Sequence, residues 1–406
     1  MSLSGKNRRA VVVFFLLAMT FCNMSLPIRI LPELRNGYQD FTIFYTSARL
    51  LRSGQASHLY DLGTQYRLQQ TFTNVPIRSG PLPYNHPPFE ALLFIPFTFL
   101  AYWPAYLLWT GVNLVMLAAS AVFLRRNFSE FAAMSPVTLG LGTTAFFPVA
   151  IGVIQGQDII LMLLLFVLAI ISFNQGKNAT AGALLGAGLF RPQLAVPLVL
   201  LFAVRRWRVL LGFVPVSLAL FGFSVAVVGW RGPFDYVYFV LHLEGTNSRA
   251  FQLGSLPNLR GLVSQLPGLN GTGTAAHLLI FLSSAVVFSW ALRRLRKGDH
   301  SAFFACSLAI VTTLLISFHS LVYDLSLLLP LVLCLIARST GSDPRKVDAP
   351  AILLAFLVLL TPIYVLLLMV IDSFFWFSLV LLGIYFWLLL SQGGDVRDRT
   401  MASIGM

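Results

Sequence analysis

The sequence predicts an all-α integral membrane protein that crosses the bilayer many times. Hydrophobic residues make up 57% of the 406-residue chain and charged residues only 11%, whereas a soluble globular domain contains about 25% charged residues. Apolar runs of the length that a helix needs to cross a bilayer, about 20 residues, recur along the whole chain. These observations exclude a soluble domain and a disordered chain.

The net charge of +13 comes from 28 Lys and Arg residues against 15 Asp and Glu residues. A nucleic-acid-binding protein would cluster such charge on a soluble domain. Here the basic residues stand between apolar runs, as they do in the cytoplasmic loops of membrane proteins. We therefore expect contacts with membrane lipids and no nucleic-acid partner. The basic segments are 6–9, 125–126, 177, 205–208, 293–297, 338–346 and 397–399.

Ten runs of roughly this length, and two shorter runs at 179–190 and 193–204, predict about twelve transmembrane helices. The first run follows Lys6, Arg8 and Arg9 without a later A-x-A cleavage site, so we expect an uncleaved membrane helix rather than a signal peptide. The expected spans cover residues 11–27, 104–124, 134–152, 158–173, 179–190, 193–204, 208–229, 275–292, 301–317, 320–337, 350–369 and 372–391.

The basic segments also predict the sidedness of the chain, because they collect in the cytoplasm. An even number of crossings must separate neighbouring basic segments after the first exit and return. This parity places both termini in the cytoplasm and Arg191-Pro192 at an outer turn between two short helices. Residues 1–391 then form one transmembrane domain with outer loops at about 28–103 and 230–274, and residues 392–406 form a short cytoplasmic tail.

The first outer loop should contain interfacial helices. One begins after Asp40 and carries Arg49 and Arg52 opposite an apolar face, which suits the membrane surface. A second stretch, 87–101, should lie along or dip into the outer surface, because parity leaves no crossing for it. The apolar face of the first helix consists of Phe41, Phe44, Tyr45, Ala48 and Leu51.

Polar residues that are costly at membrane depth are functional candidates, and in this topology they gather at outer helix ends or in outer loops. They come from separate parts of the chain and share one membrane face. A site for a lipid-anchored substrate would require this arrangement. The candidates are Asp40, His86, Gln157, Asp158, Arg191, Asn258, Arg260, His319 and Asp324.

Each candidate has a structural interpretation beside the functional one. Asp40 is either the N-cap of the predicted helix or a general base that takes a proton from an acceptor hydroxyl. Arg191 either binds phosphate or reaches lipid headgroups. His319, close to Asp324, either binds phosphate or orients an acceptor, or is a buried structural residue.

Arg260 is assigned with Arg191 to the donor phosphate, and the other candidates, Asp324 included, to substrate binding. Gln157 and Asp158 either cap the next span or hydrogen-bond sugar hydroxyls. His86 could face the site, although the prolines after it suit the first turn of a helix. Asn258 and Arg260 form a plausible outer-loop contact.

No cofactor is expected. Zinc at His319 is disfavoured because no His/Cys pair nearby completes a ligand set, although a divalent ion held by Asp40 with Asp158 or Asp324 stays open. The cysteines lie far apart inside apolar runs and predict neither a metal site nor a disulfide framework; they are Cys22, Cys306 and Cys334.

A series of short motifs falls on the predicted outer side. In chain order they are Asp40-Phe41 with Tyr45, Ala48 and Arg49; Leu59-Tyr60-Asp61; Asn85-His86-Pro87-Pro88-Phe89; Gly156-Gln157; Gly186 to Arg191-Pro192; Asn258-Leu259-Arg260-Gly261; and Ser317 to Asp324. In this order, from about residue 38 to about 340, the chain resembles glycosyltransferase family 87. That family includes polyprenyl-phosphate-mannose-dependent mannosyltransferases of GT-C fold.

The resemblance implies a GT-C architecture and a lipid-phosphate sugar, rather than a nucleotide sugar, as the donor. It implies that Asp40 is the base in the first outer loop, that Arg191 holds the donor phosphate and that His319 is the important outer-side histidine. His86 stands where the family commonly has Tyr, and Arg191 where it commonly has Lys.

The sequence thus predicts a glycosyltransferase of the bacterial plasma membrane whose site faces the periplasm or exterior. It would transfer a hexose, with mannose favoured, from a polyprenyl-phosphate sugar to a glycan or glycolipid acceptor. Direct displacement with Asp40 as base would invert the anomeric centre, and Arg191, aided by Arg260 and His319, would stabilise the departing phosphate.

Two alternatives from other classes were weighed. A transporter or flippase for a lipid-linked saccharide should place polar groups at the bilayer midplane on broken helices related by repeats, and no repeat is evident. A non-catalytic scaffold would leave the positions of Asp40, Arg191 and His319 unexplained.

Overall fold

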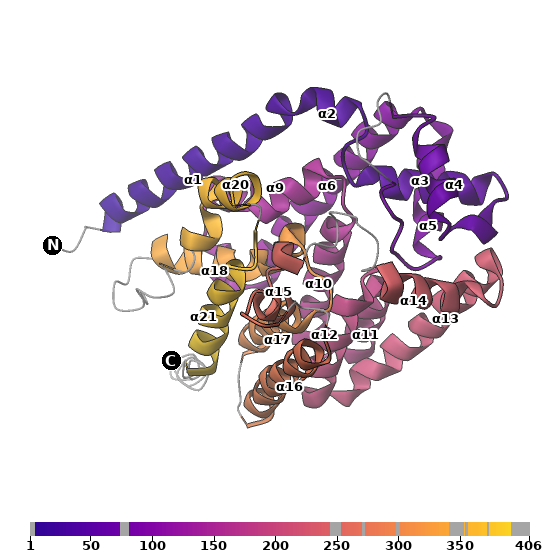
Figure 1. The fold of residues 1–406 in the computed structure, drawn as a ribbon. Coiled ribbons are helices and arrows are strands. Elements are labelled where there is room, and N and C mark those ends of the chain that lie inside the picture. Colours follow the sequence, from indigo (N-terminus) through magenta and orange to yellow (C-terminus); the bar gives the residue numbers. More distant parts are fainter. Residues whose placement is uncertain are drawn as a thin grey trace.

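The computed structural model describes residues 5–73, 81–243, 253–269, 273–297, 301–340, 353, 356–371 and 373–390, and within them every regular element is a helix. Figure 1 shows how the helices follow one another. The first part of the chain contains α1 (Gly5–Arg29), α2 (Leu31–Arg35), α3 (Phe41–Arg52), η1 (Ala56–His58), α4 (Leu62–Gln69), α5 (Glu90–Phe94), η2 (Ile95–Phe99) and α6 (Tyr102–Asn127).

The remaining helices form most of the bundle. The middle of the chain contains α7 (Ser129–Ala132), α8 (Pro136–Thr144), α9 (Phe147–Ile154), α10 (Ile159–Asn174), α11 (Asn178–Ala187), η3 (Gly188–Phe190), α12 (Pro192–Arg205), η4 (Trp207–Val209), α13 (Leu210–Val228) and α14 (Gly232–His242). The last part contains η7 (Leu253–Ser255), α15 (Leu259–Ser264), α16 (Thr274–Lys297), α17 (Ala302–Ile316), η8 (Val322–Leu328), α18 (Leu329–Thr340), α20 (Thr361–Met369) and α21 (Phe377–Leu390).

The predicted all-α membrane fold is confirmed. Among the described residues, 5 helices are long and apolar enough to cross a membrane. The other predicted spans coincide with shorter apolar helices such as α10, α11 and α12, so the number of crossings stays a prediction. Part of the span expected at 350–369, and the whole tail at 392–406, lie outside the described residues. The bilayer-length helices are Asn7–Arg29, Tyr102–Asn127, Trp207–Val228, Thr274–Lys297 and Val322–Thr340.

The run expected to span at 134–152 is not one straight helix. It consists of α8 and α9, which meet at an angle of 65°. Pro148 stands in the first turn of α9, and Phe146, two residues before it, has an extended backbone. Proline lacks the N–H that a continuous helix would need to bond back to the carbonyl of Thr144. The length of the apolar run therefore predicted helical structure over 134–152 correctly, but it did not predict the break between α8 and α9.

Helices α11 and α13 pack with their backbones in close contact. A Cβ atom on Gly182 would lie 1.7 Å from the carbonyl oxygen of Val209, and one on Gly212 would lie 1.8 Å from that of Ala179. Glycine at both positions lets the helices approach, as small residues do between membrane helices.

Replacing Gly182 by alanine should therefore destabilise the fold by about 1–3 kcal/mol, the usual cost of overpacking. The measurement is the midpoint of thermal unfolding in detergent micelles. Gly222→Ala is the matched control on α13, because a Cβ there would meet nothing within 4 Å. It should leave stability unchanged or raise it by about 1 kcal/mol or less. Equal midpoints for the two variants would contradict the close packing.

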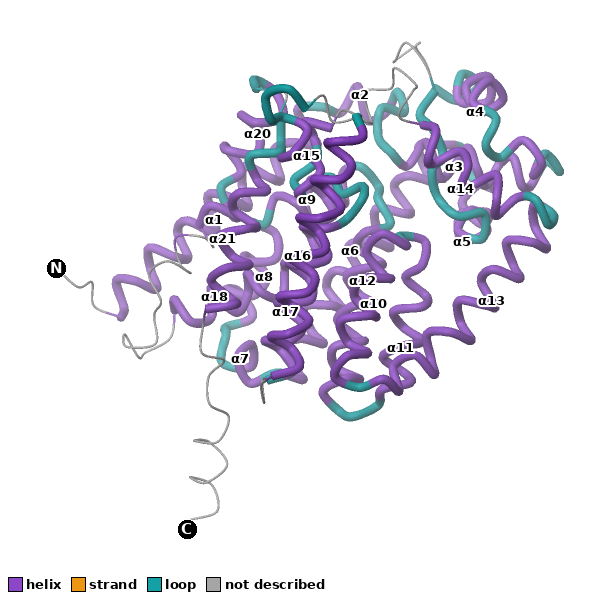
Figure 2. The backbone as a smooth tube through the Cα atoms, turned by 60° about the horizontal axis from the view of Figure 1, so that its bottom comes forward, coloured by secondary structure: helices purple, strands orange, loops and turns teal. Residues whose placement is uncertain are grey.

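The basic segments at 125–126, 177 and 205–208 lie close to one another: Nε2 of Gln175 donates to Oδ1 of Asn127 at 3.5 Å. Arg206, after α12, donates hydrogen bonds to the carbonyl of Phe173 (2.7 Å) and to Oδ1 of Asn178 (3.4 Å) on either side of Lys177. The ring of Phe128, after α6, contacts Phe303 of α17. Figure 2 shows α7 and α11 toward this lower end, and α2, α3, α4, α14 and α15 toward the upper end.

Helix α3 forms as predicted, but its apolar face contacts protein. Phe44 stacks on Phe94 of α5 with ring centroids 4.6 Å apart. Tyr45 meets Tyr102 of α6 edge-on at 5.4 Å. On the other face, Arg52 donates to the carbonyl and hydroxyl oxygens of Thr98. The aromatic residues of 90–106 thus cover a face that the sequence assigned to the membrane surface, and they fix the start of α3 beside α6.

Candidate active site

Asp40 lies at the start of α3, but its side chain does not cap the helix. Its carboxylate Oδ2 accepts a hydrogen bond of 2.7 Å from Nε2 of Gln157, and no side-chain capping bond is made to the first turn. The Gln155 side chain instead accepts from the backbone N–H of Asp40 (3.0 Å). The N-cap interpretation is therefore wrong, and the half-buried carboxylate is directed into a side-chain network.

The turn between α9 and α10 supplies the partners of Asp40. Gly156 has φ +62°, which favours glycine, and a Cβ on it would lie 2.8 Å from the Cβ of Phe41. Its carbonyl accepts from Nε1 of Trp109 at 2.8 Å. This turn therefore brings Gln155 and Gln157 against α3.

Arg191 is at the centre of the network and is 3% exposed. Its Nε donates to Oδ1 of Asp158 (2.8 Å), and its Nη1 donates to Oδ1 of Asp324 (2.7 Å). Its Nη2 donates to Oε1 of Gln157 and to Oδ1 of Asp158. The network therefore runs from two buried aspartates through Arg191 and Gln157 to Asp40.

These contacts differ from the roles expected for the same residues. Arg191 was expected to bind phosphate, but its charge is offset by two carboxylates within the protein. Asp324 also accepts from the backbone N–H of Leu321 (2.7 Å). Gln157 uses both ends of its amide within the network. Nor does Asp158, assigned either to capping or to sugar binding, cap α10 with its side chain. Sequence spacing could not show this pairing, which joins residues 133 positions apart.

The segment after α17 meets the start of α15 close by. Asn258 caps α15 by accepting from the N–H of Gly261 (2.9 Å) and donates to the carbonyl of Ser317 (2.9 Å). The Asn258 amide is thus engaged in holding these two segments together rather than directed at a substrate. The guanidinium carbon of Arg260 lies 4.0 Å from the centre of the Phe318 ring, and its Nη1 donates to the Phe318 carbonyl (3.1 Å).

Burial and neighbouring charge affect the titration of this segment. Burial lowers the pKa of Arg260 to about 10, so its guanidinium is charged at neutral pH. Burial, together with the charges of Arg191 and Arg260, lowers the pKa of His319 to about 3. The imidazole of His319 is therefore neutral at pH 7 and able to both donate and accept a hydrogen bond.

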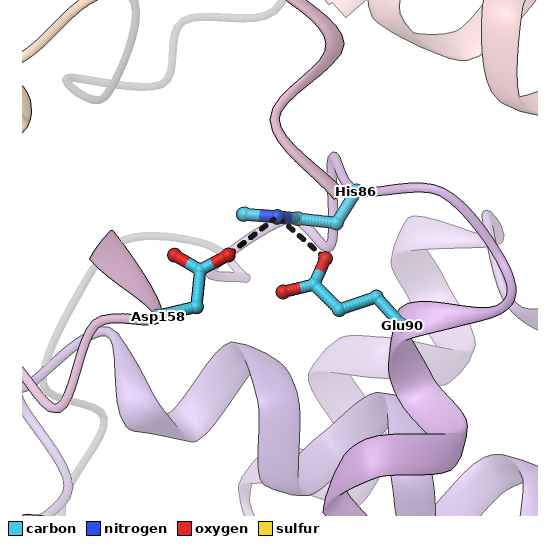
Figure 3. A group of neighbouring side chains, drawn as sticks. All are labelled: His86, Glu90 and Asp158. Atoms are coloured by element: carbon cyan, nitrogen blue, oxygen red, sulfur yellow. Dashed lines mark ion pairs between the residues drawn. The ribbon is translucent and has the colours of Figure 1, made fainter. Parts of the chain in front are cut away.

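His86 joins the network from the first loop. Its Nδ1 lies 2.7 Å from Oε2 of Glu90 and 3.8 Å from Oδ2 of Asp158 (Figure 3). Burial lowers the pKa of His86 to about 4. Glu90 was not predicted as a site residue; the signal that could have indicated it is its i,i+4 spacing from His86, across the Pro87-Pro88 helix start.

The fold and this site together define an integral membrane enzyme. Besides its bilayer-length apolar helices, the chain has a buried polar network built from the starts of α3 and α5, the α9–α10 turn, the η3–α12 junction and η8. The carboxylates, guanidinium and imidazole of the network come from distant parts of the chain.

A sequence model of glycosyltransferase family 87 matches residues 84–317, which is more than half of the chain, so the chain belongs to glycosyltransferase family 87. It is a membrane glycosyltransferase, as the resemblance implied. The matched segment contains His86, Gln157, Asp158, Arg191 and Arg260; Asp40 precedes it and His319 follows it. Comparison with curated proteins finds no match.

Proposed function

We propose that this glycosyltransferase moves a hexose, mannose being the first candidate, from a polyprenyl-phosphate sugar to a hydroxyl of a glycan or glycolipid. The reaction would take place at the periplasmic or exterior face of a bacterial plasma membrane, with both termini in the cytoplasm. The observation that carries the proposal is the hydrogen bond from Gln157 to Asp40, which holds the carboxylate away from its helix and in the polar network.

Asp40 is the general base in this scheme. The acceptor hydroxyl gives its proton to the Asp40 carboxylate as its oxygen attacks the anomeric carbon. The bond between that carbon and the phosphate oxygen breaks, and polyprenyl phosphate leaves with the electron pair. Displacement from the side opposite the phosphate inverts the anomeric centre. A general base of this kind contributes roughly 10²- to 10⁴-fold to a rate.

Gln157 and Arg191 are positioning residues in this scheme. Gln157 donates to Asp40 and accepts from Arg191, so its amide cannot flip without losing both bonds. Arg191 is held in turn by Asp158 and Asp324. Such support fixes a catalytic group in one orientation before the substrate arrives.

We assign the donor phosphate to Arg260 and His319 rather than to Arg191. Arg260 is charged at neutral pH and contacts the segment that carries His319. A neutral His319 would add one hydrogen bond to a phosphate oxygen. The guanidinium of Arg191 already serves two carboxylates, which makes it a weaker phosphate ligand.

Transfer with the purified protein in lipid nanodiscs tests the function. Polyprenyl-phosphate mannose, offered with a panel of glycan and glycolipid acceptors, should yield a mannosylated product, whereas GDP-mannose with the same acceptors should yield none. Polyprenyl-phosphate glucose is the matched donor that tests the sugar. Transfer from the nucleotide sugar, or none from either lipid donor with the whole panel, would refute the donor class.

A further inference from the structure

A second feature of the network is the cluster of His86, Glu90 and Asp158. One ligand atom from each residue lies within 4.8 Å of the others. Among the described residues, these three form a group whose side chains are of the kinds that bind metal ions. Figure 3 shows both carboxylates directed at the imidazole from one side. The side chains come from the first loop, from α5 and from the α9–α10 turn.

The facing atoms of this cluster approach one another and have no partner outside it. Within the described part of the chain, Nδ1 of His86, both carboxylate oxygens of Glu90 and Oδ2 of Asp158 are buried and make no hydrogen bond to a group outside the cluster. All three residues are at least nine-tenths buried: His86 is 8% exposed, Glu90 2% and Asp158 0%. Buried polar atoms without partners are rare because each costs about 1–3 kcal/mol. The converging atoms therefore call for a positive group between them.

The charges around the cluster also favour a bound cation. Asp158 and Glu90 approach Nδ1 of His86 from the same side, and Asp324 and Asp40 follow along the network. The single positive charge of Arg191 is paired with Oδ1 of Asp158 and with Oδ1 of Asp324. Buried carboxylates require pairing with cations. A divalent cation at the cluster would offset the charge that Arg191 leaves uncompensated.

We propose that His86, Glu90 and Asp158 bind a divalent first-row metal ion. In such a site each ligand atom lies about 2.0–2.2 Å from the ion. Three atoms held in this way would lie somewhat closer to one another than the 4.8 Å limit that includes them here. The ion would draw Nδ1 of His86 toward the side of the carboxylates. His86 also hydrogen-bonds to the backbone of Phe190. Metal-binding histidines usually make such a bond with the other ring nitrogen.

The donor set favours Zn²⁺ over Ca²⁺ and Mg²⁺. An imidazole nitrogen suits borderline transition ions, whereas the two hard cations prefer oxygen ligands alone. Such an ion would hold α5 of the first loop against the α9–α10 turn. It would also fix Asp158, and through Arg191 and Gln157 the orientation of Asp40.

Calorimetric titration of Zn²⁺ into the full chain, stripped with a chelator and held in nanodiscs, tests the site. We expect stoichiometric binding to the unsubstituted chain. Glu90→Gln and His86→Gln should each weaken the affinity by at least about 10–100-fold, which is the effect of losing even an outer-shell partner. Glu33→Gln on α2 and His58→Gln on η1 are matched controls at exposed positions, and they should bind as the unsubstituted chain does.

Co²⁺ provides a second readout that does not depend on activity. The visible d–d absorption of Co²⁺ bound to the unsubstituted chain should change in His86→Gln, because a nitrogen ligand is lost. Absence of Zn²⁺ binding by the unsubstituted chain, or equal binding by Glu90→Gln and His86→Gln, would overturn the site. Sugar transfer is measured separately, so loss of the proposed donor specificity would leave these binding results unaffected.

Discussion

Asp40→Asn should reduce the turnover number for sugar transfer by about 10²- to 10⁴-fold, the share that a general base contributes. The KM for the lipid donor should change little, because the lost interaction exists in the transition state. Asparagine has the shape of aspartate and still accepts the hydrogen bond from Gln157, so the network should survive. The measurement is steady-state kinetics with the thermal midpoint recorded alongside.

Asp61→Asn is the matched control for this substitution. Asp61 belongs to the same loop between α1 and α6 and is exposed, and its carboxylate caps α4 by accepting from the N–H of Thr64. Asparagine is an equally good N-cap, so this variant should keep full turnover. Full activity of Asp40→Asn would refute the base assignment, and a drop of the same size in Asp61→Asn would show that the effect is not specific to the site.

The positions of the helices were predictable because a bilayer imposes its thickness on every crossing. The runs expected at 104–124, 208–229 and 275–292 fall within Tyr102–Asn127, Trp207–Val228 and Thr274–Lys297, give or take a residue at the ends. The break between α8 and α9 was less visible, since a hydropathy window does not register one proline. The covering of α3 by residues 90–106 was not predictable either, because a lipid and an aromatic side chain present the same apolar surface to a sequence pattern.

The candidate site was predictable as a set but not as a network. The number of crossings between basic segments predicts one shared face for Asp40, Gln157, Asp158, Arg191 and Asp324. In the structure these residues form one continuous chain of hydrogen bonds. Which group pairs with which depends on tertiary contacts, and a single sequence carries no signal for them. An arginine at an outer turn therefore looked like a phosphate ligand, although two distant aspartates engage it.

The partners of Arg191 lead to the second large effect. Arg191→Gln should destabilise the fold by about 3–5 kcal/mol, because removing one partner of a buried ion pair leaves a buried charge uncompensated. Here both Asp158 and Asp324 would lose their cation. The loss is measured as a lower thermal midpoint and as the shift of a chemical unfolding curve in detergent micelles.

A double variant separates this structural role from direct phosphate binding. Asp324→Asn added to Arg191→Gln removes one uncompensated carboxylate and should recover part of the lost stability, since the two sites share one interaction. Arg67→Gln is the control, because Arg67 is exposed and its Nη2 donates to the hydroxyl of Thr64; it should change stability by less than about 0.5 kcal/mol. If Arg191→Gln instead kept its full stability and lost only affinity for the lipid donor, Arg191 would be the phosphate ligand after all. Asp158 and Asp324 would then serve to aim its guanidinium, and the phosphate role assigned to Arg260 would fall.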